Sequence, residues 1–416
     1  MHRGIISPVL AGCLVATAMA AAARAQSAPG TRGPAANLEQ PIVFYVARGA
    51  PGICGPGCSE WIAAEGTIDP AAEPRLWELL RKLGNDRKPP VYFHSPGGSV
   101  TAGLQLGRLL RARGLTVGVG WTLPSTCDRQ NPGAPACDAL KRSGREVAAE
   151  LDISSGLCAS SCSYAILGGA ARYIGIDARV GIHDMFPSPT IRSFDENGRI
   201  VDRPHPTSAE TARSGMAQMY GVIAGYVNAM GISVDLVKAA HAVPSEKMHT
   251  LTREELASFG IDRRDTVESA WSLVDNPSGV SAVKVIETRD GTGGAFRRAT
   301  LSLTCRDART VLLRYVPQVG AEAESEPAAL RVNAGARSFP LVRLADAAPG
   351  ENRPRVANHG AEVPIASLDA EAFMIEVVAT SGQAPNSPAA TSGPLVVQAA
   401  APAVAALARR CGSGAR

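Results

Sequence analysis

The first candidate for chemistry is Ser160, a serine among very small residues within the segment 157–165 (LCASSCSYA). The segment runs on as an apolar stretch that predicts a helix beginning near this serine. A serine at a crowded turn can expose its hydroxyl, which becomes a nucleophile when a base removes its proton. We therefore interpret Ser160 as a nucleophile for acyl transfer. The alternative is structural, with Ser160 capping the helix, or with Ser161 or Ser163 bonded to its backbone.

A glycine-rich turn upstream, 95–99 (SPGGS), supplies a second part of such a site. Its two glycines permit unusual backbone conformations and let a substrate carbonyl approach main-chain N–H groups closely. Preset donors of this kind stabilise a developing oxyanion. A helix beginning at Ser160 would aim the next N–H into the same space. The alternative is an ordinary strand-to-helix turn. We predict that the amides of Gly98 and Ser161 form an oxyanion hole. We predict that Gly97 and Ser99 bind the substrate.

The predicted general base is His183, which follows the apolar strand-like run 178–182 (ARVGI). Residues at strand ends line clefts, and an imidazole can accept the proton of a serine hydroxyl. The alternative is a buried or rim histidine paired with Asp184. A second histidine, His94, also ends a predicted strand beside the glycine turn, and we assign it to the wall of the pocket.

Strands and helices alternate around these residues, which predicts an α/β fold built of repeated crossovers. Residues 122–155 interrupt the alternation and are interpreted as an insertion. Asn197-Gly198 within 191–201 predicts a hairpin with a type I′ turn. We expect buried strands at 41–47, 90–94, 115–119 and 178–182, one helix beginning at Ser59, and further helices at 73–83, 100–112, 208–230, 231–242 and 252–259.

The pattern changes toward the C-terminus, where alternating apolar and polar residues predict a β-rich domain. Its expected strands are 283–288, 299–304, 311–316 and 373–378, and its closing helix is 404–410. The predicted organisation is a signal peptide (1–25), a flexible lead-in (26–39), an α/β domain (40–272), a linker (273–282) and the smaller β-rich domain (283–416).

The N-terminal 25 residues have the features of an export signal. Arg3 gives a short basic start, residues 5–23 are apolar and small, and 23–25 (ARA) before Gln26 fits the small-x-small cleavage rule. The alternatives are an uncleaved anchor helix and, because 10–13 (LAGC) resembles a lipobox, lipidation. We predict a periplasmic or secreted protein with no membrane association after cleavage.

Nine cysteines occur, and Cys13 leaves with the signal peptide. An even number in an exported chain predicts disulfides. Zinc is the alternative, since two Cys-x3-Cys spacings occur. We predict that Cys127–Cys137 closes a Pro/Gly-rich loop and that Cys305–Cys411 ties the C-terminal helix to a strand. The other four cysteines are expected to pair among themselves, which would fasten the Cys54–Cys58 loop near the nucleophile helix. These four are Cys54, Cys58, Cys158 and Cys162.

Composition narrows the function classes. Of the 416 residues 45% are hydrophobic and 5% aromatic, which allows a sizeable core and, with 42 glycines and 30 prolines, favours a loop-rich α/β chain. The formal net charge is +4, without a Lys/Arg block or basic stripe, so nucleic-acid binding has no electrostatic support. We also expect no cofactor and no metal.

Together, SPGG, the small residues before Ser160 and the motif Arg-Val-x-Ile-His at 179–183 resemble the Clp protease proteolytic subunit. They are also similar to the signal peptide peptidase and membrane-bound serine protease branches of the same group, which includes crotonases. The resemblance covers 40–270 and is greatest to exported Clp-like proteins. It implies a ClpP/crotonase-like spiral of β-β-α units, Ser160 as nucleophile, His183 as base, and Gly98 with Ser161 as oxyanion donors. It also implies a peptide or protein substrate and a homo-oligomer whose subunit contacts complete the site.

One departure concerns the third catalytic residue of the Clp pattern, an Asp. The matching stretch, 240–244 (AHAVP), has no carboxylate, and Asp235 and Glu246 only flank it. A Ser-His dyad, a different acid and a degenerate site all remain open. We predict an exported serine hydrolase, a peptidase that cleaves extended peptides. The alternative is a catalytically degenerate module that binds peptides or proteins. Acyl-thioester chemistry of the crotonase kind is disfavoured, because coenzyme A is cytoplasmic and crotonases do not use a Ser/His pair.

Overall fold

The computed structural model describes thirteen segments of the chain. The expected signal peptide, the lead-in up to residue 37 and the Asn197-Gly198 turn lie outside these segments. Among the described helices, none has the length and apolar character needed to cross a membrane. The described segments are 38–55, 57–185, 190–194, 200–204, 209–276, 279–289, 295–317, 330–334, 337–344, 358–368, 372–377, 395–398 and 401–413.

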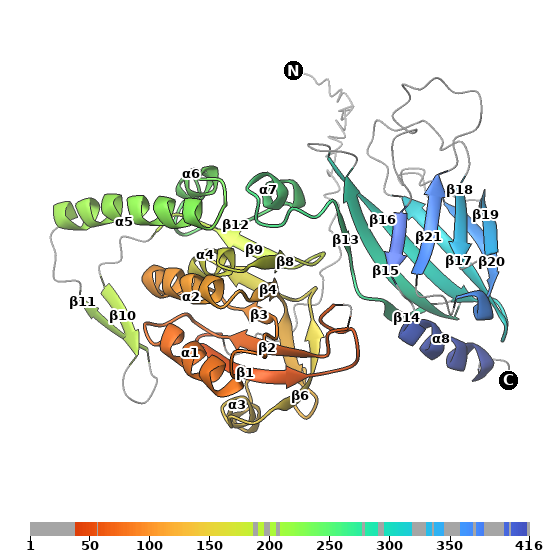
Figure 1. The fold of residues 1–416 in the computed structure, drawn as a ribbon, viewed down its shortest axis with the longest axis horizontal. Helices are drawn as coiled ribbons and strands as arrows, with labels where there is room; N and C mark the ends of the chain where they lie inside the picture. The colour runs from red at the N-terminus through yellow and green to blue at the C-terminus, as the bar shows by residue number, and fades with distance from the viewer. Residues whose placement is uncertain are drawn as a thin grey trace, which may run out of the picture. The chain divides into compact units, whose positions relative to one another are not determined.

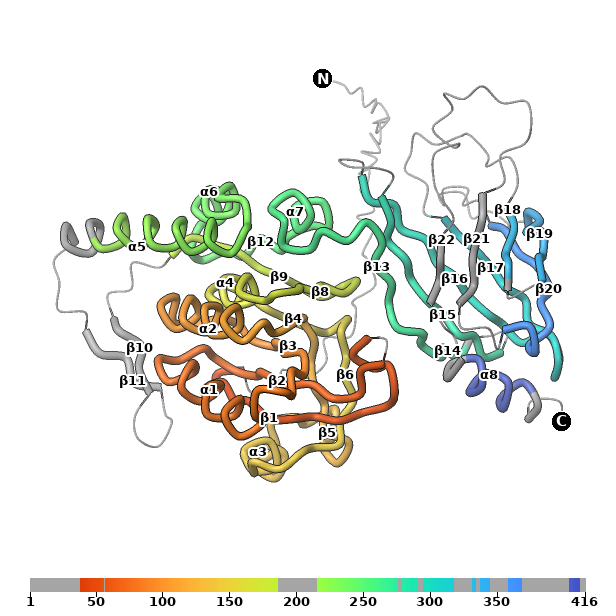
Figure 2. Tube along the Cα trace, viewed as in Figure 1, coloured from red at the N-terminus to blue at the C-terminus, as the bar shows by residue number. Residues whose placement is uncertain are grey.

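The N-terminal part is an α/β unit around a seven-stranded mixed sheet, as the expected fold class requires (Figure 1). The sheet order is β5-β6-β1-β2-β3-β4-β8, with parallel pairing from β2 through β3 and β4 to β8. Figure 2 shows the trace passing from β3 through α2 into β4. The elements are β1 (Val43–Arg48), β2 (Glu60–Glu65), α1 (Ala72–Leu83), β3 (Val91–His94), α2 (Val100–Ala112), β4 (Thr116–Val119), β5 (Trp121–Pro124), α3 (Pro135–Lys141), β6 (Val147–Asp152) and β8 (Ala171–Tyr173).

A second, three-stranded sheet of order β12-β9-β7 carries the segments that the sequence motifs single out. Its strands are β7 (Leu157–Ala159), β9 (Arg179–Ile182) and β12 (His249–Thr250), and α4 (Ser161–Leu167) follows β7 directly. The remaining elements are the antiparallel hairpin of β10 (Thr190–Phe194) and β11 (Ile200–Pro204), and the helices α5 (Ala209–Ala229), α6 (Asp235–His241) and α7 (Arg253–Ser258).

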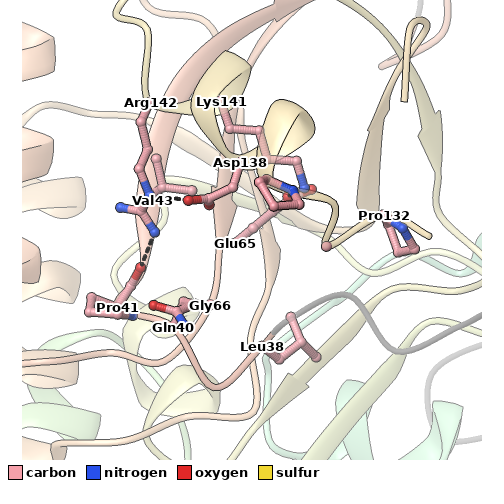
Figure 3. A pocket seen from close by; sticks show the side chains of 12 residues that line it. Leu38, Gln40, Pro41, Val43, Glu65, Gly66, Pro132, Asp138, Lys141 and Arg142 are labelled. Carbon is pink, nitrogen blue, oxygen red and sulfur yellow. Dashed lines mark hydrogen bonds and ion pairs between the residues drawn. The ribbon is translucent and has the colours of Figure 1, made fainter. Parts of the chain in front are cut away.

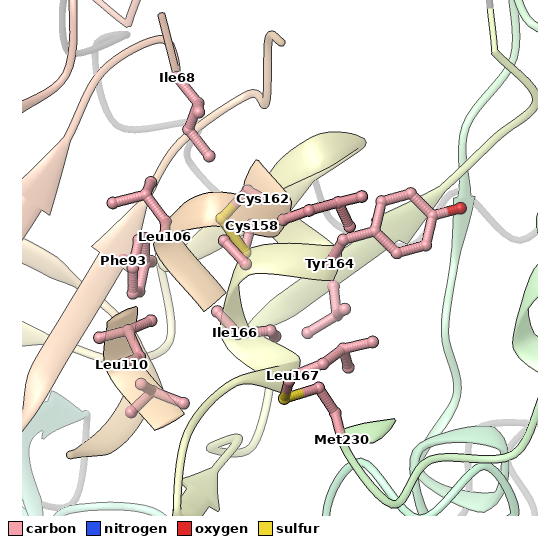
Figure 4. Close-up of a cluster of buried hydrophobic side chains, with 14 of the residues drawn as sticks. Ile68, Phe93, Leu106, Leu110, Cys158, Cys162, Tyr164, Ile166, Leu167 and Met230 are labelled. Carbon is pink, nitrogen blue, oxygen red and sulfur yellow. A yellow bond between two sulfur atoms is a disulfide. The ribbon is translucent and has the colours of Figure 1, made fainter. Parts of the chain in front are cut away.

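The main hydrophobic core lies between α2, α4 and the strands beneath them. Leu106 and Leu110 of α2, Phe93 of β3 and Ile166 of α4 are all fully buried in this cluster (Figure 4). Cys158 and Cys162 lie in the same cluster and are joined by a disulfide. The segment around Ser160 is therefore anchored in the core on both sides.

Two local expectations were wrong. The helix expected from Ser59 is strand β2, which pairs with β1 on one side and with β3 on the other. Residues 61–64 are completely buried, and a strand buried on both faces shows a continuous apolar run without alternation. Residues 122–155 are not a separate insertion, because β6 pairs in parallel with β1 and so extends the sheet.

The C-terminal part is a ten-stranded antiparallel sheet with one helix, in agreement with the expected β-rich domain (Figure 1). Of the residues that we expected to form a linker, 273–276 belong to β14 and 279–282 to β15, and these two strands pair with each other. The elements are β13 (Thr266–Glu268), β14 (Ser272–Asn276), β15 (Gly279–Arg289), β16 (Phe296–Cys305), β17 (Thr310–Pro317), β18 (Leu330–Ala334), β19 (Arg337–Arg343), β20 (His359–Pro364), a 3-10 turn (Ile365–Ser367), β21 (Ala372–Val377), β22 (Leu395–Gln398) and α8 (Ala401–Ser413).

Candidate active site

Ser160 occupies a strained turn between β7 and α4. Its φ is 56° and its ψ is −126°, and among the described residues only one other non-glycine residue, Asp177, has a positive φ. Such a conformation costs about 1–3 kcal/mol and persists only where the surrounding structure enforces it. The Ser160 side chain is half-buried and makes no capping hydrogen bond to α4. Ser160 therefore occupies the N-cap position of α4, but its hydroxyl does not cap the helix.

The neighbouring serines have structural positions. Ser163 is buried, and its Oγ lies 2.7 Å from the carbonyl oxygen of Gly181 and 3.1 Å from that of Cys158. Ser161 is fully buried as the first residue of α4, so its N–H has no partner within the helix. Ser160 is thus the least buried of the three serines, and the oxyanion role predicted for the Ser161 amide stays a prediction.

The glycine turn packs directly on this serine turn. Gly97 has a φ of 99°, and a Cβ placed on it would lie 2.6 Å from the Cβ of Ser160 and 3.0 Å from the nitrogen of Ser161. The approach to Ser160, and a further one of 2.5 Å to the Ala159 carbonyl oxygen, are shorter than real Cβ contacts, so this position requires glycine. The two turns that sequence analysis assigned to one site are therefore in contact.

The amide of Gly98 is oriented by its neighbours. Ile68 donates its N–H to the Gly97 carbonyl at 2.7 Å and accepts the Ser99 N–H at 2.8 Å. In such a parallel bridge the central residue, Gly98, points its own N–H away from the partner strand. Ser99 also caps α2, since its Oγ accepts the Ala102 N–H at 3.3 Å. That hydroxyl is occupied in the fold, whereas the substrate-binding role predicted for Ser99 stays a prediction.

His183 comes to the same edge of the small sheet as Ser160. Strands β7 and β9 are parallel, with Ala159 opposite Gly181, and Ser160 donates its N–H to the Gly181 carbonyl at 2.9 Å. Ser160 follows β7 and His183 follows β9, so both leave the carboxyl ends of neighbouring parallel strands. His183 is half-buried. Ser160 and His183 therefore leave the same end of this sheet, and the roles predicted for them stay predictions.

The stretch that matches the missing Asp lies beside His183. The N–H of Asp184 donates to the Val243 carbonyl at 2.9 Å, so 240–244 contributes backbone at this place. The Asp184 carboxylate lies 3.2 Å from Nδ1 of His241, and that nitrogen lies 3.0 Å from the Tyr220 hydroxyl. The flanking Asp235 pairs with Lys238 at 2.8 Å.

His94 belongs to the structural layer behind the site. It is 6% exposed, its Nδ1 accepts the Leu157 N–H at 3.2 Å, and its ring stacks on Trp121 with centroids 5.9 Å apart. Burial lowers the His94 pKa to about 4, and the charges of Lys141 and Arg179 act in the same direction. A neutral, buried imidazole that accepts a backbone hydrogen bond supports the start of β7.

All eight cysteines outside the N-terminal segment are paired. The bonds Cys127–Cys137 and Cys305–Cys411 form as predicted. The other four cysteines do not link the two segments, because each pair closes on itself as Cys54–Cys58 and Cys158–Cys162. The two Cys-x3-Cys spacings thus hold local disulfides rather than zinc ligands. Sequence separation alone could not decide this, since both arrangements satisfy the even count.

A cavity of about 260 Å³ lies apart from these residues, beside α3 (Figure 3). Glu65 and Lys141 line it as a buried ion pair, with Oε2 and Nζ 2.5 Å apart. Burial raises the pKa of Glu65, while the Lys141 charge opposes that shift. The Thr122 N–H also donates to Glu65. This network joins α3 and β5 to β2 and does not include the candidate catalytic residues.

Comparison with known proteins gives structural relatives only. No protein-family model matches the chain. No curated protein matches it. Two solved structures are similar: a mutant of the membrane-bound stomatin-specific protease 1510-N (12% identity, TM-score 0.27, 47% of this chain and 73% of that chain), and a mutant of ClpP1 from Listeria monocytogenes (14% identity, TM-score 0.29, 54% of this chain and 90% of that chain).

Both structures belong to the group that the sequence motifs resemble, and each aligns with about half of this chain. At such low identity the similarity concerns the fold alone. Any assignment of activity depends on the residues and contacts described above.

Proposed function

We propose that this protein is a serine hydrolase with Ser160 as nucleophile and His183 as general base. The observation that carries the proposal is the conformation of Ser160. A half-buried serine with a φ of 56° and no capping bond stands at the end of β7, beside the strand that ends at His183. A structural serine has no need of this strained conformation, whereas a nucleophile at a sharp strand-to-helix turn does.

The proposed reaction uses four groups. His183 removes the hydroxyl proton as Ser160 Oγ bonds to the carbonyl carbon of the substrate. The oxyanion accepts hydrogen bonds from the amides of Gly98 and Ser161, which are fixed before the reaction. His183 then gives its proton to the leaving group as the carbon–leaving-group bond breaks. Water, deprotonated by His183, hydrolyses the acyl-enzyme and restores the Ser160 hydroxyl.

Extended peptides are the substrate class that this geometry favours. The parallel bridge between Ile68 and Gly98 leaves the main-chain groups of Gly98 directed away from Ile68. A peptide segment can pair with such groups as an added strand, which would bring a scissile carbonyl to the 97–98 turn. A homo-oligomer, whose contacts would enclose the site, belongs to the same proposal.

A fluorophosphonate probe tests the assignment, because it reacts with activated serines. We expect covalent labelling of the purified protein at Ser160, found by peptide mapping. Labelling should be lost in Ser160→Ala and strongly reduced in His183→Ala. The exposed serine Ser154 provides the control, and Ser154→Ala should label like the wild type. Labelling that survives Ser160→Ala would exclude Ser160 as the nucleophile.

A non-catalytic module that binds peptides is the second candidate. The observation in its favour is the backbone of Val243 at the place expected for a carboxylate, with Asp184 bonded to His241. A folded wild-type protein that resists the probe yet binds extended peptides would establish this function. Loss of that binding in a Gly97→Ala protein that still folds, with binding kept in Gly144→Ala, would place the peptide at the same turn.

We also propose that the protein acts in an oxidising compartment, either periplasmic or extracellular. Four disulfides within the described segments support this, because thiols are kept reduced in most cytoplasms. The export signal predicted from residues 1–25 supports it independently.

A further inference from the structure

A disulfide encloses the proposed nucleophile. Cys158 is the central residue of β7 and Cys162 is the second residue of α4, and their bond closes a ring that contains Ser160 (Figure 4). Both cysteines are completely buried, whereas Cys54 and Cys411 of other pairs retain some exposure. The two ends of the Ser160 turn are therefore covalently joined inside the core.

The strain at Ser160 needs such a restraint. Release of an unfavourable φ favours relaxation of the turn, and one neutral hydrogen bond returns no more free energy than this strain. Several hydrogen bonds hold the turn, because Ala159 and Ser160 donate their N–H groups to the Ser95 and Gly181 carbonyls and the Ser163 hydroxyl lies near the Gly181 and Cys158 carbonyls. None of these bonds joins β7 to α4 covalently, as the disulfide does. Gly97 blocks the turn from one side by contact with Ser160. A covalent link between Cys158 and Cys162 limits the remaining freedom to three residues.

We propose that the Cys158–Cys162 disulfide is a positioning element that holds Ser160 in its reactive conformation. The inference rests on the proposed function, since it concerns the reactivity of the same hydroxyl. When the bond is absent, the 159–161 segment relaxes, the Ser160 hydroxyl leaves the approach to His183, and the Ser161 amide leaves the oxyanion hole. The fold itself persists, because the core around α2 and α4 keeps its apolar contacts.

The chain offers a matched control. Cys54–Cys58 closes a ring of the same size, with a sequence separation of 4 in both disulfides, and lies in another cluster of the core. Equal rings restrict the unfolded chain to the same extent. The variants Cys158→Ala/Cys162→Ala and Cys54→Ala/Cys58→Ala should thus differ chiefly in what the disulfide does to the native state.

The experiment measures two properties of the full mature chain. Hydrogen–deuterium exchange reports whether the peptide containing 159–163 becomes mobile. Fluorophosphonate labelling, analysed as kinact and KI, reports the reactivity of Ser160. In Cys158→Ala/Cys162→Ala we expect faster exchange in that peptide and a kinact lowered on the order of a hundredfold, with KI little changed. In Cys54→Ala/Cys58→Ala we expect wild-type exchange at 159–163 and wild-type kinact.

The outcomes are separable. Unchanged exchange at 159–163 in the Cys158/Cys162 variant would overturn the positioning role, whether or not the protein labels. Faster exchange in a protein whose wild type never labels would support the restraint and reject the proposed hydrolase. Equal kinact in the two variants would also overturn the inference. If the alanine pair fails to fold, Cys158→Val/Cys162→Ala restores buried volume on β7 and permits the same measurements.

Discussion

At the scale of single residues, the site depends on two backbone positions with positive φ that touch each other. Ser160 adopts a conformation that disfavours a side chain, and Gly97 lies against it where a side chain has no room. Ser160 carries a side chain despite this unfavourable φ, and Gly97 lies where the contact leaves no room for one. This reciprocity explains why SPGG and the serine motif occur in one sequence.

Gly97→Ala should therefore damage the site as well as the fold. The added Cβ would lie 2.5 Å from the Ala159 carbonyl oxygen, at a φ of 99° that L-residues rarely adopt. We expect destabilisation of about 2 kcal/mol or more and a fall in fluorophosphonate labelling on the order of a hundredfold. Urea denaturation and labelling kinetics measure the two effects.

Gly144→Ala is the control for backbone strain alone. Gly144 has a φ of 72°, and nothing lies within 4 Å of a Cβ placed there. The Gly144→Ala variant should have a lower free energy of unfolding because of the unfavourable φ, and its fluorophosphonate labelling should proceed at the wild-type rate. A Gly97→Ala protein that labels as fast as Gly144→Ala would contradict the contact between the two turns.

At the scale of elements, His94 connects three strands behind the site. It ends β3, accepts the first N–H of β7 and stacks on Trp121 of β5. Its pKa falls from 6.5 to about 4 on folding because burial penalises the charged imidazolium. Between these values the unfolded chain binds the additional proton, so stability decreases as the pH falls from 6.5 to 4.

The loss attributable to this histidine should total about 3 kcal/mol, which is complete below pH 4 and absent above pH 6.5. His94→Asn removes the titration and retains an acceptor, so its urea-unfolding free energy should vary less over that interval than the wild-type value. Equal slopes for wild type and His94→Asn would show that His94 is not the source.

The sequence predicted the type of an element correctly where one face of a helix is exposed to solvent. The helices at 73–83 and 100–112 were expected from their apolar spacing, and α1 and α2 occupy nearly those residues. Strand β2 was not predictable in the same way, because both of its faces are buried between layers. A continuous apolar run is compatible with a buried helix or a buried strand, and only pairing with β1 and β3 distinguishes them.

At the scale of the whole molecule, we expect the free energy of unfolding to depend on whether the cysteines are oxidised to disulfides. Cys305–Cys411 has a sequence separation of 106, far larger than the other disulfides, and fastens α8 to β16. Closing a loop of this length restricts the unfolded chain by about 4–5 kcal/mol in the chain-entropy treatment. The β-rich part of the chain should consequently depend on the compartment in which it folds.

Expression with the native N-terminus should yield a protein that begins at Gln26 and carries eight oxidised cysteines. Expression of residues 26–416 in a reducing cytoplasm should yield free thiols and a lower thermal midpoint. Thiol-trapping mass spectrometry and calorimetry measure these results. Cys305→Ala/Cys411→Ala in the exported protein should reproduce most of the lost stability, and an unaltered midpoint in that variant would refute the coupling.

The residues available for chemistry could be predicted from the sequence alone: the serine turn, the glycine turn, the histidine at a strand end, and an even set of cysteines. These features are local, because each depends on residue type and on neighbours within a few positions. The tertiary structure alone decided that β2 is a strand, that β6 completes the sheet, and that Cys158 pairs with Cys162 rather than with the Cys54–Cys58 loop. These outcomes depend on burial and on distances between segments far apart in the chain, which no local pattern encodes.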